Sequence, residues 1–311
     1  MWFSSAVLSL VLLCKSALAA DPAPTSSPEL DLELRTHSIY APYVDQDLQN
    51  RWFSFGADAY VNTNKYIRLT RDKASQTGWL WSVLPIGVSH YQIEVEFKIS
   101  GAGSHLFGDG MAIWLTTKRA EVGPVFGSID NFEGLGVFID TFANSRHSYS
   151  FPRVMAMLGD GKTHYEVSDD GDATSIGGCS AQVRKLNVPS KIRITYYKSQ
   201  SLNVELLYKS SDEWTSCFSV PNITLPAAPY LGFTALTGEL SDAHDVLSVS
   251  TRAVTPEKPK PGRGAVKAST SSFSFGGLLL KLIFIGAVGA MGVAAYRTYY
   301  AQRGQWSSKR F

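Results

Sequence analysis

The 311-residue chain has little net charge and few charged residues. It contains 29 Lys and Arg against 27 Asp and Glu, a formal net charge of +2, and only 18% of its residues are charged. It has no long run of basic residues, which argues against a nucleic-acid-binding surface. With 44% hydrophobic and 12% aromatic residues in a regular pattern, it is also not a disordered chain.

The sequence also lacks any helical period lasting three turns before the apolar segment near its end. Short β-type runs take its place, and Tyr91–Ile99 alternates apolar and charged residues as a strand buried on one face does. Seven further runs have β character: Met111–Thr117, Leu135–Phe142, Val154–Leu158, Lys191–Tyr197, Leu202–Tyr208, Tyr230–Leu236 and Val246–Arg252. Many short strands separated by Gly, Asp, Asn and Ser predict an all-β antiparallel sandwich or barrel.

Two apolar segments lie near the chain ends. Residues 1–20 contain the apolar stretch Ala6–Leu13 and end in Ala17-Leu18-Ala19, which predicts a cleaved secretory signal peptide rather than an uncleaved buried helix. Residues 276–296 are apolar over a length that, at about 1.5 Å per residue, matches a bilayer core of ~30 Å. They predict one transmembrane helix.

A cleaved signal followed by one span predicts a single-pass type I membrane protein. Its lumenal domain is residues 21–254, and its cytosolic tail is residues 297–311. Between the domain and the span, residues 255–275 are rich in Pro, Gly and Ser and contain no heptads, so they predict a stalk without a coiled coil.

The sequence has three cysteines, and Cys14 leaves with the signal peptide. In an oxidising lumen, the remaining Cys179 and Cys217 predict one disulfide, with two buried free thiols as the alternative. Such a loop closure would stabilise the fold by roughly 4 kcal/mol in the chain-entropy model. Asn222-Ile223-Thr224 is the one sequon and predicts an N-glycan at Asn222.

Oxygen-bearing side chains follow one of the predicted strands. Residues at i, i+2 and i+4 of an extended segment project to one side, so Asp140, the Phe142 carbonyl and Asn144 would share one site. The acidic stretch Asp169–Asp172 would add a carboxylate. Calcium takes six to eight oxygen ligands of these kinds. An Asx-turn without metal is the alternative, and no loop has the glutamate that an EF-hand requires.

Four segments carry a resemblance to a known family: Phe107–Trp114, Gly123–Ser128, Phe138–Asn144 and Gly238–Asp245. In order and spacing they are similar to the L-type (leguminous-type) lectins of the secretory pathway, from about Tyr40 to Arg252. The short stalk and single span resemble the vesicular integral-membrane branch. The resemblance implies a concanavalin-like (jelly-roll) antiparallel β-sandwich, with a calcium-organised site that binds high-mannose N-glycans of cargo glycoproteins.

The resemblance assigns roles residue by residue. The calcium ligands would be Asp140, the Phe142 carbonyl, Asn144 and Asp170. The mannose-binding groups would be Asp109, Asn144 and the backbone amides of Gly238, Glu239 and Leu240, with Glu239 replacing the family's Asp. Cys179 and Cys217 match the family disulfide, and the terminal Phe311 resembles the export signals that family members present to vesicle coat proteins.

Three positions depart from the family pattern. Phe138 replaces a glutamate that helps plant relatives to bind a transition metal, so we expect no second metal. Val167 replaces a sugar-contacting histidine, and Trp79 replaces a sugar-contacting serine and would either stack on a sugar or fill the cleft. Without a site histidine, binding should vary little between about pH 7 and 6 unless His147 or His244 substitutes.

Three functions compete on these grounds. The first is a calcium-dependent mannose lectin acting in transport or quality control between the endoplasmic reticulum and the Golgi. The second is a membrane cargo adaptor of the same fold that binds protein partners with little or no sugar affinity. The third, a glycoside hydrolase, needs a pair of catalytic carboxylates. The sequence has no Glu-x-Asp-x-x-Glu strand, so we expect no enzyme.

Overall fold

The computed structural model describes residues 30–209, 213–256 and 287–299. The predicted signal peptide, nearly all of the stalk, the first half of the predicted transmembrane segment, and Phe311 lie outside the described residues. The chain divides into two compact units, Met1–Glu257 and Lys258–Phe311.

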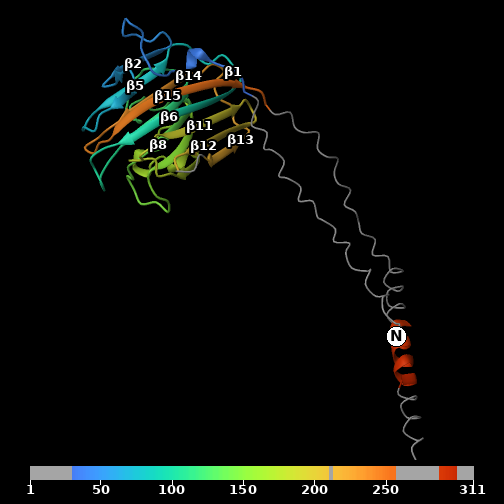
Figure 1. Ribbon diagram of the computed structural model, residues 1–311. Helices are drawn as coiled ribbons and strands as arrows, with labels where there is room; N and C mark the ends of the chain where they lie inside the picture. The colour runs from blue at the N-terminus through green and yellow to red at the C-terminus, as the bar shows by residue number, and fades with distance from the viewer. Residues whose placement is uncertain (1–29, 210–212, 257–286, 300–311) are drawn as a thin grey trace, which may run out of the picture. The chain divides into compact units, whose positions relative to one another are not determined.

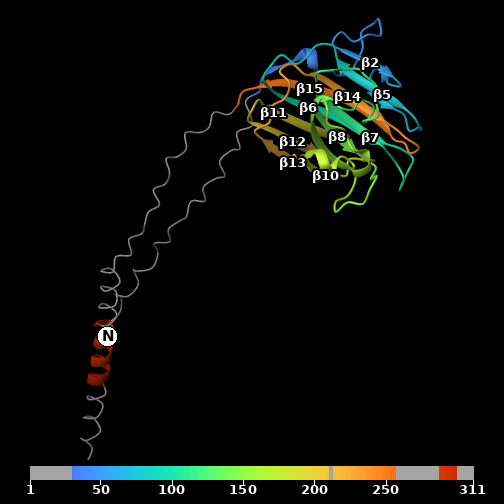
Figure 2. The same cartoon turned by 180° about the vertical axis from the view of Figure 1, so that it is seen from behind.

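The first unit is a sandwich of two antiparallel sheets, which Figures 1 and 2 show from opposite sides. The eight-stranded sheet runs in the order β13 (Thr215–Pro221), β12 (Ser201–Leu207), β11 (Ser190–Tyr197), β6 (His90–Ser100), β15 (Ala243–Val254), β4 (Tyr66–Thr70) and β3 (Tyr60–Asn62), with β1 (Leu30–Glu33) also paired to β15. The seven-stranded sheet runs in the order β10 (Ser175–Ser180), β9 (Arg153–Asp160), β8 (Glu133–Asp140), β7 (Gly110–Thr116), β14 (Tyr230–Leu236), β5 (Thr77–Ser82) and β2 (Phe53–Ala57). Short 3-10 turns follow β1 (η1, Arg35–His37) and β9 (η2, Val167–Asp169, and η3, Asp172–Thr174).

The all-β sandwich expected from the sequence is confirmed. Each of the eight predicted runs lies on a strand, and the difference that matters for the site is at the end of β8. The apolar run suggested a strand through Phe142, but β8 ends at Asp140. There the Thr141 amide donates to the Asp109 carbonyl at 2.9 Å and the Phe142 amide donates to Asp140 Oδ1 at 3.0 Å, so neither continues the ladder.

Alternating side chains build two apolar layers. Inward-facing residues of both sheets, such as Val95 on β6 and Val137 on β8, form the core between the sheets. The opposite face of the seven-stranded sheet carries a second cluster, which includes Trp114 and Phe138 and packs against Phe126 and Tyr165. Because both faces of β7 and β8 are buried, these strands make a rigid base for the residues at their ends.

A disulfide joins the two sheets at one edge. Cys179 on β10 and Cys217 on β13 are bonded, with their Cα atoms 5.3 Å apart, as expected from the sequence. β10 and β13 stand at the ends of their respective sheets, so the bond closes the sandwich on that side.

In the second unit the structure describes one helix, over residues 287–299. Within the ranges described, no helix has the length and apolar character needed to span a bilayer. The transmembrane segment expected at residues 276–296 lies partly outside those ranges and stays a prediction.

Candidate functional site

The first element of the site is the buried carboxylate of Asp140, at the end of β8. Its side chain is almost inaccessible, with 4% of its surface exposed. Burial raises the pKa of Asp140 well above its usual value, the Phe142 amide opposes that shift, and the neighbouring Asp170 and Asp109 carboxylates raise the pKa further. An ionised Asp140 in this place therefore requires a compensating cation.

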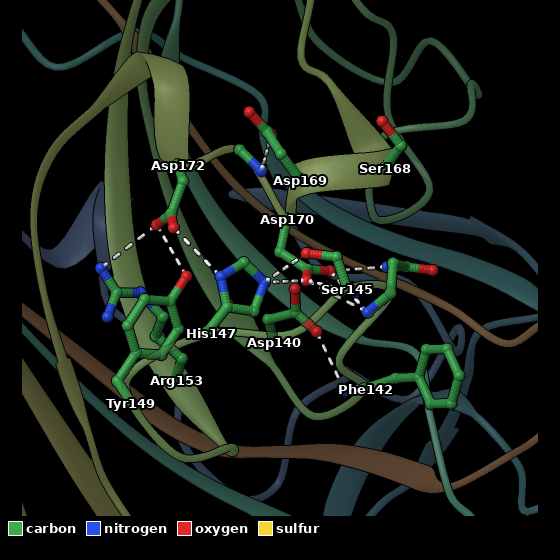
Figure 3. Close-up of polar contacts among 12 residues, drawn as sticks. Asp140, Phe142, Ser145, His147, Tyr149, Arg153, Ser168, Asp169, Asp170 and Asp172 are labelled. Carbon is green, nitrogen blue, oxygen red and sulfur yellow. Dashed lines mark hydrogen bonds and ion pairs between the residues drawn. The ribbon is translucent and has the colours of Figure 1, made fainter.

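Asp170 lies beside Asp140 and comes from the turn after η2, where its φ of 55° is in the left-handed region. It is 1% exposed and accepts hydrogen bonds from the Asn144 amide at 3.0 Å, from Asn144 Nδ2 at 2.7 Å and from the Ser145 amide at 3.3 Å. Figure 3 shows Asp170 at the centre of these contacts, between Ser145 and His147. The loop after β8 is thus tied to a carboxylate 26 residues further along the chain.

A histidine completes the surroundings of Asp170. His147 Nε2 lies 2.6 Å from Asp170 Oδ2, and its Nδ1 lies 3.1 Å from Asp172 Oδ2. The Tyr149 hydroxyl donates to Asp172 at 2.6 Å, and the Tyr149 ring stacks on His147 with centroids 4.6 Å apart (Figure 3). The sequence analysis named His147 as a possible substitute for the missing site histidine. It did not predict that Asp172 and Tyr149 contact His147.

The donor atoms at this place fit calcium by their chemistry. Asp140 and Asp170 offer carboxylate oxygens, Asn144 offers an amide and Phe142 offers a backbone carbonyl, all from two segments that the hydrogen bonds hold together. Calcium prefers such mixed oxygen ligands. Across residues 30–209, 213–256 and 287–299 no group of three or more His, Cys, Asp or Glu side chains has metal-binding geometry, so the set depends on its amide and backbone oxygens.

Asp109 lies next to this loop, at the start of β7. Its carbonyl accepts from both the amide and the hydroxyl of Thr141, each at 2.9 Å. Its carboxyl is half-buried, and burial raises its pKa while a hydrogen bond from the Gly238 amide lowers it. Asp109 therefore bridges the loop after β8 and the loop after β14.

The loop after β14 presents Gly238, the exposed Glu239 and the half-buried Leu240. A Cβ atom at Gly108 would lie 3.1 Å from Phe142 Cβ and 3.8 Å from Leu240 Cβ. Glycine at this position lets three segments approach closely. The structure thus brings together every residue that the resemblance assigned to metal or sugar: Asp109, Asp140, Phe142, Asn144, Asp170, Gly238, Glu239 and Leu240.

The three departing positions carry apolar side chains in different surroundings. Trp79 on β5 is half-buried and covers Gly56 so closely that a Cβ there would lie 2.3 Å from its ring. Phe138 is buried and stacks on Phe126 with ring centroids 5.0 Å apart. Val167 is 46% exposed, and its carbonyl accepts from the Asp170 amide.

Comparison with known proteins identifies the family. Residues 31–260 match the legume-like lectin family. The chain belongs to that family. Lectins bind carbohydrate and are not enzymes, in agreement with the expectation from the sequence.

An L-type lectin-like domain-containing protein of Schizosaccharomyces pombe is 33% identical over 274 residues, covering 86% of this chain and 88% of the relative. The VIP36-like protein of Mus musculus is 38% identical over 262 residues, covering 80% of this chain and 75% of the relative. Among solved structures, the VIP36 exoplasmic/lumenal domain in its Ca²⁺/Man3GlcNAc-bound form has a TM-score of 0.67 and 33% identity, covering 73% of this chain and 92% of that chain. These relatives support the expected vesicular integral-membrane branch.

Proposed function

We propose that this protein is a calcium-dependent lectin for high-mannose N-glycans, anchored in the membranes of the early secretory pathway as a type I protein. The observation that carries the proposal is a chain of contacts around the loop Asp140–Asn144. Asp170 accepts from the Asn144 amide, the Asp109 carbonyl accepts from the Thr141 amide, and the Asp109 carboxyl accepts from the Gly238 amide. The similar VIP36 domain, crystallised with Ca²⁺ and Man3GlcNAc, supports it.

Calcium in this proposal is held by Asp140, the Phe142 carbonyl, Asn144 and Asp170. A bound calcium ion would supply the positive charge that the two buried carboxylates need. The Asp170 carboxylate accepts the Asn144 side-chain amide at 2.7 Å, which would leave the Asn144 side-chain oxygen for the ion.

In this proposal the sugar is bound by Asp109, Asn144 and the loop Gly238–Leu240. Asp109 accepts hydrogen bonds from mannose hydroxyls, Asn144 donates one, and the amides of Gly238, Glu239 and Leu240 hold the ring. Groups fixed in this way discriminate hydroxyl patterns because each misplaced hydroxyl leaves a polar partner unpaired. No bond in the sugar is broken.

The proposed cellular role rests on the predicted signal peptide, the predicted transmembrane segment and the predicted cytosolic tail. The protein cycles between the endoplasmic reticulum, the intermediate compartment and the Golgi, carries glycoprotein cargo on its lumenal side, and contacts vesicle coat proteins through a tail ending in Phe311. Deleting Phe311 should hold more protein in the endoplasmic reticulum, and an unchanged distribution would count against the signal.

The exposed Asn222, just after β13, is the proposed site of an N-glycan.

Glycan-array binding with calcium and with a chelator tests the function. High-mannose binding that disappears with the chelator is the expected result. Val167 and Trp79, apolar where the family contacts sugar, favour one other candidate: a cargo adaptor of the same fold that binds protein partners. Retained partner binding with no glycan signal in either condition would favour that adaptor.

A further inference from the structure

Arg184 is a buried arginine that is not among the residues assigned to the proposed sugar site. Arg184 follows β10 and pairs with Ile99 in an isolated bridge at the end of β6. Its side chain is 6% exposed, and that of its partner Asp242 is 0% exposed. The guanidinium donates to both carboxylate oxygens of Asp242 at 2.7 Å.

Arg184 also contacts a second loop. One of its nitrogens donates to the Gly103 carbonyl at 2.8 Å, and its guanidinium lies 3.8 Å from the ring centroid of Phe107. The planar, forked guanidinium is suited to such simultaneous contacts, and lysine is not. One side chain thus fixes a carboxylate, a carbonyl and an aromatic ring.

These partners lie on the two loops that present the sugar-binding groups. Phe107 is two residues before Asp109, and Asp242 is two residues after Leu240. A second link joins the same loops, because Asp72 accepts from the Ala102 amide at 2.6 Å and from the Ser241 hydroxyl at 2.9 Å. The segment 101–108 and the segment 238–242 are therefore held by shared partners.

We propose that Arg184 is a positioning residue for carbohydrate binding, which holds the loops 101–108 and 238–242 at the separation where Asp109 and the amides of Gly238–Leu240 meet one sugar ring. The inference rests on the proposed lectin function. Its polar partners, Asp242 and Gly103, are not proposed calcium ligands. Arg184 therefore acts on sugar affinity and leaves calcium affinity unchanged.

The test compares Arg184→Gln with a matched control in the full chain. Arg193→Gln removes an arginine that also pairs with a carboxylate, Glu94, at 2.8 Å and also lies 3.8 Å from an aromatic ring centroid, that of Trp214, but on the eight-stranded sheet. Arg184→Gln should weaken binding of a high-mannose N-glycan by about tenfold or more, since the two loops keep only their weaker, exposed link through Asp72. Arg193→Gln should leave that affinity unchanged, and calcium affinity should be unchanged in both.

Removing Arg184 alone leaves Asp242 buried without its partner, which destabilises the fold. The double variant Arg184→Gln/Asp242→Asn removes both charges and keeps the test valid if the single variant does not fold. Arg184→Lys should give an intermediate glycan affinity, because an ammonium retains the charge but not the fork.

Amide hydrogen exchange of the metal-loaded protein gives a readout independent of sugar. In Arg184→Gln, or in the double variant, segments 101–108 and 238–242 should both exchange faster, with residues 140–145 unchanged. Unchanged exchange in either segment would overturn the positioning role. A wild type that binds no glycan would refute the proposed function, and with it the part of the inference that concerns sugar, while the exchange result still decides whether Arg184 couples the loops.

Discussion

The proposed metal half and the proposed sugar half of the site are built differently. Asp140 and Asp170 are buried in the metal half, and the fold holds them with backbone amides and with His147. The proposed sugar half lies on the loops around Asp109 and Gly238–Leu240, with Glu239 exposed. Two positions outside these loops, the exposed Val167 in η2 and the half-buried Trp79 on β5, are apolar. Buried carboxylates constrain the metal half, whereas surface positions can change in the sugar half at little cost to the fold.

Removing a buried carboxylate should have the largest effect. Asp140→Ala should abolish calcium binding, because the site loses an anionic ligand that no other group replaces. Isothermal titration with calcium measures this. Asp160→Ala is the control, since Asp160 ends the neighbouring strand and binds the Lys162 and Thr163 amides in an exposed turn. Wild-type calcium affinity in the Asp140 variant would refute the metal assignment.

The next variant separates the two halves. Asp109→Asn should lower glycan affinity roughly 10- to 100-fold, since it removes a charged hydrogen-bond acceptor. Calcium affinity should fall much less, because Asp109 acts on Asp140 only through its charge and is not a proposed calcium ligand. Its backbone contacts with Thr141 do not depend on the side chain. Two separate titrations of the same preparation give both values: calcium without glycan, and glycan at saturating calcium. Equal losses in both would mean that the halves are not separable.

Trp79 tests how far the sugar half departs from the family pattern. Trp79→Ser should lower the free energy of unfolding by roughly 2 kcal/mol. The ring packs over Gly56 and against the second apolar cluster, which includes Trp114 and Phe138. Glycan affinity should stay the same if Trp79 only fills the cleft, as this packing suggests. Chemical denaturation and glycan titration measure the two effects, and a large loss of affinity would show that the ring stacks on sugar.

The stability of the fold should depend on pH through a buried histidine of the eight-stranded sheet. His244 on β15 is fully buried against Thr70, and burial lowers its pKa to about 3. The unfolded state binds this proton near pH 6.5 and the folded state does not. Stability therefore falls as the pH drops below 6.5, by up to about 1.4 kcal/mol per pH unit. His244→Phe should remove the contribution of His244 from denaturation curves and leave that of the buried His37, whose pKa burial also lowers. The exposed His105→Phe should leave the slope unchanged.

The smallest effect is expected for glycan binding between pH 7 and 6 at saturating calcium. Val167 cannot titrate, so wild-type affinity should change little over that unit, and Val167→His should gain acid sensitivity. Of the two histidines that could substitute for the missing one, His147 is the better candidate. His147 contacts the proposed calcium ligand Asp170, whereas His244 is fully buried against Thr70. A tenfold drop in wild-type affinity that disappears in His147→Gln would assign the sensitivity to His147.

Local patterns predicted eight of the fifteen strands that the structure describes, and they predicted one part of the proposed metal site. The proposed sugar-binding residues were predicted from the resemblance to the lectin family. The alternation in Tyr91–Ile99 matches β6, and the spacing of Asp140, Phe142 and Asn144 matches one loop. β10 gave no signal because Ser and Gly dominate its sequence, and its pairing depends on β9. The contacts of His147 and Arg184 join distant segments, which no local periodicity encodes.

The central claim is that calcium in the metal half organises the sugar half. Binding of the two ligands must then be coupled, and the coupling is reciprocal. Calcium titrations of the purified protein, with and without a saturating high-mannose N-glycan, measure it directly. The account predicts a higher calcium affinity when the glycan is present. The same calcium affinity in both titrations, with the glycan bound equally well after chelation, would contradict it.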